Sequence, residues 1–210
     1  MSFALVGSSY GDAYPTMGTT LSVSPTTIGN WFICTFFCSF PNTGAITGGG
    51  VTTWTLIQQD NGHAYSSQTW IGQITATGSQ TITYSTSFLY LGTIVQEFSV
   101  LPPLTFDTSS IVDEGQSPAV SSGNFPSATT SGSNEMACGF TFVSGSSPTL
   151  STSTSGYTYT PTYSHGMFGV FNTNVSGAQS PNWSSTAPVG GTFVTILLTG
   201  GSGMKIIGIT

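Results

Sequence analysis

Residues 30–40 read NWFICTFFCSF and carry no charge. Every second residue from Phe32 to Phe40 is apolar, whereas the residues between them are mixed. A period of two with one wholly apolar face is typical of a β-strand that turns one side toward a core. The following PNTG, residues 41–44, breaks the strand. We therefore expect a core strand here. A membrane-spanning helix is not expected, because it requires about 18 or more apolar residues in a row.

The composition of the whole chain is also that of a β-protein. Ser and Thr make up 67 of the 210 residues, Gly adds 27, and the 12% aromatic content is high for a chain with so little charge. Strand-forming residues alternate with the turn formers Gly, Pro, Asn and Ser. We expect an all-β fold with almost no helix.

The charge balance excludes several classes of partner. Lys205 is the only cation, against seven acidic residues. Binding to nucleic acid or to an anionic membrane surface requires clustered Lys or Arg, so we expect neither. The N-terminal MSFALVGSSYGD lacks the basic region and the long apolar run of a signal peptide, so we expect a soluble chain without a leader.

A second stretch, NEMACGFTFVS from Asn134, resembles the first at an offset of 104 residues, which aligns Cys138 with Cys34. Shorter similarities follow in the same order along both halves, including Gly92 with Gly191. Chance matches also arise in a Ser- and Thr-rich chain, so an internal repeat is a hypothesis.

The predicted architecture is one antiparallel β-sandwich, jelly-roll-like, over residues 1–210. Two halves, about 19–100 and 134–210, would interleave, and residues 101–133 would form a connecting loop. The expected strands are 19–24, 30–40, 51–59, 64–76, 80–85, 91–100, 134–144, 155–163, 166–173, 190–199 and 204–210.

The three cysteines have no CxxC spacing and therefore no zinc or redox signature. Cys34 and Cys38 lie four residues apart on one strand, so their Cα atoms are about 13 Å apart. A disulfide spans less than about 7 Å. Cys138 could meet Cys34 only if their two strands are neighbours. The simpler interpretation is three buried thiols in a reducing cytoplasm.

The titratable residues show no catalytic or metal-binding pattern, so we expect no catalytic residue, no metal and no cofactor. His63 and His165 lie in Gly-containing segments and are expected to be exposed loop residues. Asp113 and Glu114 are adjacent, whereas a calcium loop places its oxygen ligands at alternating positions, so we expect a solvated loop. Glu97 is expected on an outward or interfacial face of its strand.

Aromatic side chains are the candidates for binding, because an exposed aromatic face can stack on a sugar ring. The same residues can equally belong to the core or to a subunit contact, which is the interpretation we favour. The five candidates for a carbohydrate or partner contact are Trp54, Trp70, Trp183, Tyr157 and Tyr159, with Tyr65 and Tyr163 as further members of the aromatic set.

Three motifs in a fixed order resemble a known group of proteins. IGNWFI from Ile28 precedes TWTL from Thr53, and the alternating ITATGSQTITYS follows. This order resembles β-sandwich proteins from the virion gene modules of tailed bacteriophages, over most of residues 20–199. The chain has Asn30 where those proteins commonly carry Asp, and Thr53 where Gly is common.

The resemblance implies a non-enzymatic structural protein of the virion, with capsid decoration or cementing as the first expectation. It also implies major capsid or tail proteins as partners, a homo-oligomer with a trimer as the specific guess, and synthesis in the host cytoplasm. The alternative is a tail-associated module that binds a receptor or carbohydrate. A depolymerase would need paired carboxylates at a cleft, and the seven acids are mostly isolated in sequence.

Overall fold

The computed structural model describes residues 3–13, 20–39, 44–85, 90–100, 104–114, 119–144, 148–161 and 167–200. These residues form fifteen β-strands and no helix. Every strand pairing among them is antiparallel. The expected all-β antiparallel fold is therefore confirmed. Within the same residues, no helix has the length and hydropathy needed to span a membrane.

The first half of the chain forms two sheets. A five-stranded sheet has the order β1-β8-β3-β6-β5, and a three-stranded sheet has the order β2-β7-β4. The strands are β1 (Ala4–Ala13), β2 (Thr20–Val23), β3 (Trp31–Cys38), β4 (Ala45–Gly48), β5 (Val51–Asp60), β6 (Ser66–Ile74), β7 (Gln80–Ser85) and β8 (Tyr90–Ser99).

The second half is built around one long strand, β15 (Asn182–Gly200). Residues 182–189 of β15 pair with β10 and β12, whereas residues 190–200 pair with β11 and β9. The other strands are β9 (Leu104–Glu114), β10 (Val120–Asn124), β11 (Ala128–Ser144), β12 (Leu150–Ser151), β13 (Thr158–Tyr159) and β14 (Phe168–Gln179).

Both halves have the same strand order. The sheet β1-β8-β3-β6-β5 corresponds to β9-β15-β11-β14-β13, and β2-β7-β4 corresponds to β10-β15-β12. The separate strands β7 and β8 of the first half are continuous in the second half as β15. Two antiparallel sheets packed in this order form a sandwich that is jelly-roll-like, and each half is called a jelly roll below. The chain therefore consists of two jelly rolls, and the internal repeat exists at the level of strand order.

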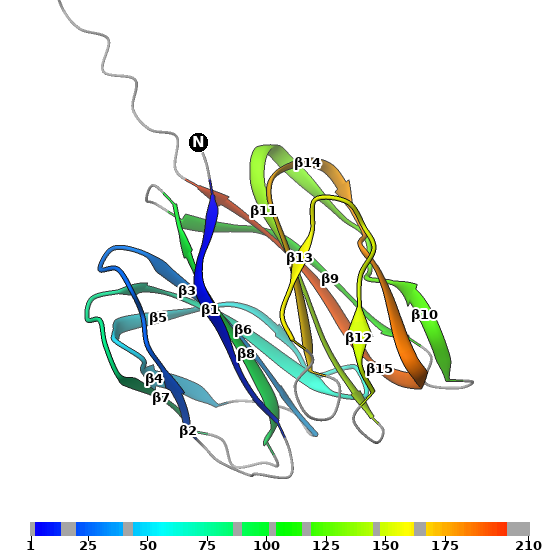
Figure 1. The fold of residues 1–210 in the computed structure, drawn as a ribbon, viewed down its shortest axis with the longest axis horizontal. Helices are drawn as coiled ribbons and strands as arrows, with labels where there is room; N and C mark the ends of the chain where they lie inside the picture. The colour runs from blue at the N-terminus through cyan, green and yellow to red at the C-terminus, as the bar shows by residue number, and fades with distance from the viewer. Residues whose placement is uncertain are drawn as a thin grey trace, which may run out of the picture.

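The two large sheets pack face to face and share one apolar core, the central core. Phe37 of β3 contacts Phe142 of β11 across it, with ring centroids 6.2 Å apart. Each jelly roll has a further core, its outer core, between its large and small sheets. Figure 1 shows the two halves side by side, the first blue to green and the second green to red. No described sheet combines strands of the two halves, so the expected interleaving is wrong.

The opening stretch is buried on both faces. Phe32, Cys34 and Phe36 face the outer core of the first jelly roll. Ile33 and Phe37 face the central core. The structure confirms the predicted strand and corrects its environment, because β3 lies between two layers and not at the surface of one.

The residue alignment of the repeat is wrong by one position. Phe32 and Phe36 face the outer core of their jelly roll, whereas the aligned Met136 and Phe140 face the central core. Side chains alternate between faces, so equivalent positions must share a face. An offset of 105 pairs Phe37 with Phe142, which meet in the central core.

The predicted loop 101–133 is also wrong, because it contains β9, β10 and the start of β11. Among the described strands β9 pairs only with β15, and its Ser- and Thr-rich sequence has weak apolar alternation. β1, β4 and the short β12 were likewise not predicted. The expected strand 204–210 lies outside the described residues.

Candidate functional site

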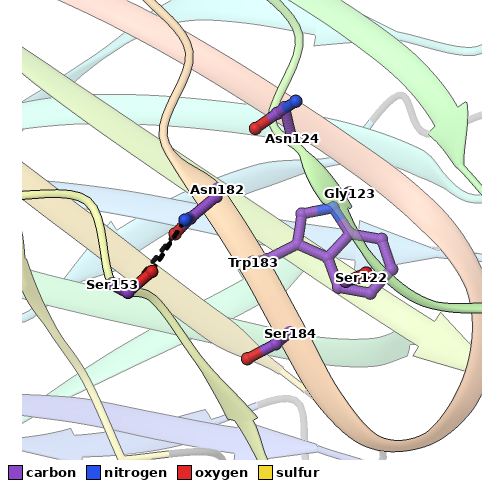
Figure 2. A pocket seen from close by; sticks show the side chains of 7 residues that line it. All are labelled: Ser122, Gly123, Asn124, Ser153, Asn182, Trp183 and Ser184. Carbon is purple, nitrogen blue, oxygen red and sulfur yellow. Dashed lines mark hydrogen bonds between the residues drawn. The ribbon is translucent and has the colours of Figure 1, made fainter.

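A polar hollow lies on the outer face of the small sheet of the second jelly roll (Figure 2). Its volume is about 340 Å³. The hollow lies over the neighbouring strands β10 and β15, in which Ser122 pairs with Ser184 and Asn124 pairs with Asn182. Alternate residues of a strand share a face, so these four side chains form one array. The hollow is lined by Ser122, Gly123, Asn124, Ser153, Asn182, Trp183 and Ser184.

Hydrogen bonds hold one side of the hollow rigidly. Oδ1 of Asn182 accepts from the Ser153 amide at 2.9 Å and from the Thr152 hydroxyl at 3.0 Å. Nδ2 of Asn182 donates to Oγ of Ser153 at 2.8 Å, as Figure 2 shows. The Asn124 side chain is exposed and forms no hydrogen bond with the described residues. The side-chain amide of Asn182 is therefore fixed, whereas that of Asn124 is available to a ligand.

Trp183 forms the floor beneath this array and not an exposed platform. Its side chain is 1% exposed, and its ring stacks on Phe193 with centroids 4.7 Å apart. Gly123 lies directly over the indole, because a Cβ at position 123 would stand 3.0 Å from Cζ2 of Trp183. Nε1 of Trp183 is buried without a hydrogen-bond partner among the described residues.

A second concavity, the seam groove, lies where the two jelly rolls meet. Its volume is about 350 Å³. Leu56 of β5 and Phe106 of β9 are each 38% exposed. No described strand pairs with the outer edge of β5, which is the last strand of its sheet. The groove is lined by Trp31, Thr55, Leu56, Ile57 and Ile71 from the first half, and by Leu104, Thr105 and Phe106 from the second.

The structure separates the five predicted aromatic residues. Trp54 stacks on Phe32 and its Nε1 donates to the carbonyl of Gly48, while Trp70 packs against the same outer core. Both lie in the first jelly roll. A single platform made of all five residues is therefore absent.

The other three candidates lie in the second jelly roll. Trp183 is buried, and the half-buried Tyr157 donates its hydroxyl to Gln179 at 2.9 Å. Burial, with a smaller electrostatic effect of Cys138, raises the pKa of Tyr157. Only Tyr159 of the five is largely exposed, at 55%. Of the further aromatics, Tyr65 packs against the central core, and Tyr163 lies outside the described residues.

Glu97 was expected on an outward or interfacial face; it is a buried carboxylate, so the outward placement is wrong. It accepts hydrogen bonds from the Thr26 amide at 2.9 Å, the Thr26 hydroxyl at 2.9 Å and Nδ2 of Asn30 at 2.6 Å. The Thr27 amide is a fourth donor at 3.3 Å. These bonds hold the β2–β3 connection against β8. The role of Glu97 is therefore structural.

Asp113 joins the two jelly rolls. It lies in β9 and not in the solvated loop that was expected. Its Oδ1 accepts from the Thr192 hydroxyl at 2.6 Å, and its Oδ2 accepts from the Ala64 amide at 2.9 Å. The Tyr65 amide in turn donates to the Thr192 hydroxyl at 3.1 Å. The β5–β6 turn of the first half is thus fastened to the second half.

His63, in the same turn, is paired and only partly exposed. Nδ1 of His63 lies 2.7 Å from Oδ2 of Asp60, and the His63 side chain is 31% exposed. His63 therefore lies in a loop, as expected, but it is only partly exposed. His165 lies outside the described residues.

The carboxyl groups of Glu135 and Asp107 contact each other in the second jelly roll. Glu135 is 1% exposed, and its Oε2 has no donor among the described residues. Burial raises the pKa of Glu135, and its contact with Asp107 raises it further. Burial alone would raise the pKa of Asp107, but hydrogen bonds from Ser131 lower it. A proton on Glu135 would give both carboxyl groups a partner.

The three thiols are buried and free, so the expected burial of all three is confirmed. Cys34 and Cys138 lie in different cores and do not bridge. Among the described residues, no three His, Cys, Asp or Glu side chains gather closely enough to hold a metal ion.

Comparison with protein-family models, with curated proteins and with solved structures finds no match. Of the residues that line the hollow and the groove, only Trp183 was a candidate from the sequence, and it was predicted for an exposed aromatic contact. Asn124 and Asn182 are two polar residues in a chain rich in them. Leu56 and Phe106 are single apolar residues in strands with exposed faces.

Proposed function

We propose that the chain is a non-enzymatic structural protein of a tailed-bacteriophage particle. Capsid decoration is the favoured role, and a tail-accessory role is the alternative. Jelly rolls are a common architecture of viral capsid proteins, which supports the proposal by analogy of fold. The resemblance of the IGNWFI and TWTL motifs supports it from the sequence.

The observation that carries the proposal is the seam groove. An exposed apolar patch beside an unpaired strand edge marks a protein-interaction surface, because both apolar area and backbone hydrogen bonds remain to be satisfied. Leu56 and Phe106 lie on opposite sides of the seam. Since the two sides are fused through the central core, the groove is a rigid surface for a capsid or tail protein. Contacts of this kind depend little on salt.

Counting the chain in purified particles tests the proposal. Decoration predicts a copy number comparable to that of the capsomers, whereas a tail position predicts a few copies per particle. Trypsin has one site, Lys205, so peptides for quantification should come from chymotrypsin, which cuts after aromatic residues. Absence of the chain from particles would refute both roles.

A reconstitution experiment tests the groove itself. The double variant Leu56→Ser and Phe106→Ser should bind particles that lack the protein at least about tenfold more weakly, because apolar burial is lost. Ile28→Ser is the matched control, since Ile28 is 65% exposed and does not line the groove. Equal binding of all forms would contradict the role of the groove. Native mass spectrometry of the purified chain tests the proposed trimer.

A further inference from the structure

We propose that the polar hollow binds one neutral sugar unit of a polysaccharide. The inference goes beyond the structural role and does not depend on it. The sugar would bind to an array of amide and hydroxyl groups, in place of the exposed aromatic platform considered from the sequence. The volume of the hollow, about 340 Å³, is at the small end for ligand pockets, which suits a single sugar ring.

The lining has the chemistry that a polyol requires. Ser122, Ser184 and Asn124 present hydroxyl and amide groups from two neighbouring strands. Each such group can both donate and accept a hydrogen bond, as each sugar hydroxyl can. Two adjacent sugar hydroxyls can therefore bind across the strand pair. The fixed amide of Asn182 limits the orientations in which they fit.

The charge of the site selects for a neutral ligand. No charged side chain lines the hollow, and the described residues contain neither Lys nor Arg because Lys205 is the only one in the chain. The net charge of −6 disfavours sulfated, phosphorylated and uronic sugars. A nucleobase or aromatic ligand would need an open ring face, and Trp183 is covered.

Gly123 keeps the floor of the hollow low. Any side chain there would press on Cζ2, Cε2 and Nε1 of Trp183, at 3.0–3.1 Å from the added Cβ. The indole has little room to retreat because it stacks on Phe193. A larger residue would therefore shift β10 and change the shape of the hollow.

The test is a screen of the purified chain against neutral and charged host-envelope saccharides, followed by calorimetric titration of the best binder. Asn124→Ala should weaken binding by about two- to tenfold, the effect of one lost hydrogen bond. Gly123→Ala should weaken it as well. Ser22→Ala is the matched control, because Ser22 is exposed on β2, the counterpart of β10 in the first jelly roll.

The outcomes separate clearly. Saturable binding to a neutral saccharide that Asn124→Ala weakens and Ser22→Ala leaves unchanged would support the proposal. No binding, binding of charged saccharides only, or binding that Asn124→Ala leaves intact would overturn it. Asn124 is exposed, so the variant should fold, and its thermal unfolding confirms this independently. Absence of the chain from particles would refute the structural role without affecting this result.

Discussion

The ring of Tyr65 stands edge-on to the ring of Phe142, with centroids 4.8 Å apart, although the two residues belong to different jelly rolls. Phe142 also contacts Phe37, so it packs against two aromatic residues of the first half. The Tyr65 amide is held by the hydroxyl of Thr192. The contact between the halves therefore combines apolar packing with directed hydrogen bonds, which is the basis of a single rigid body.

Phe142→Ala should lower the free energy of unfolding by about 3–5 kcal/mol, because it leaves a cavity in the central core. Scanning calorimetry of the wild-type chain should show one transition, since neither half keeps its large sheet covered without the other. Ile28→Ala, at an exposed position, should change stability by less than about 0.5 kcal/mol. Two separate transitions in the wild-type chain would contradict the shared core.

Glu135→Gln should stabilise the protein at neutral pH. Glu135 is buried and its pKa is raised, so its charged form is disfavoured in the folded state. The glutamine keeps an acceptor for the Gly132 amide and adds a donor toward Asp107. A gain of about 1 kcal/mol would raise the Tm by about 2–4 °C in a chain of this size.

The pH dependence of this effect has a defined sign. A raised carboxyl pKa means that the folded state binds more protons than the unfolded chain. The contribution of Glu135 therefore falls as pH rises from its ordinary pKa of 4.5 through the raised value. The lowered pKa of Asp107 has the opposite effect: its contribution to stability is lost as pH falls below its ordinary pKa of 3.8. Wild-type and Glu135→Gln unfolding curves should converge toward acid pH; a constant difference between pH 4 and pH 8 would contradict this account.

Glu97→Ala should destabilise the first jelly roll strongly. Four donors from the β2–β3 connection would lose their acceptor, among them the buried Asn30 amide. The expected loss in unfolding free energy is on the order of 3 kcal/mol. Glu97→Gln, which keeps one acceptor oxygen, should lose less. Chemical denaturation of the three forms would measure the order, and equal stability of wild type and Glu97→Ala would exclude the structural role.

The native thiols should not react with a disulfide reagent at pH 8. Burial raises the pKa of Cys34 to about 11, against smaller opposing effects of hydrogen bonds with Thr93 and Tyr84. Burial also raises the pKa of Cys138. The thiolate is the reactive form, so both exclusion of the reagent and lack of charge prevent reaction. Three equivalents should react in denaturant, and rapid native labelling would contradict the burial of these cysteines.

Some of the architecture was predictable from local sequence. Alternation in 30–40, 80–85 and 91–100 predicted β3, β7 and β8 to within two residues at each end, because a strand exposes its period in its own residues. β9 was missed because many of its residues are Ser and Thr without a clear apolar alternation, and Ser and Thr also occur in loops.

The sequence by itself determined that the chain is an all-β protein with few charged residues, many hydroxyl groups and apolar alternating strands, because composition and period are local properties. Only the tertiary structure decided that β3 is buried on both faces and that Phe142 completes a core begun by Phe37. It also brought Asn124 opposite Asn182 and Leu56 opposite Phe106. These pairs lie about fifty residues or more apart in sequence, and their meeting depends on which strands pair and which sheets stack. No local pattern records that choice.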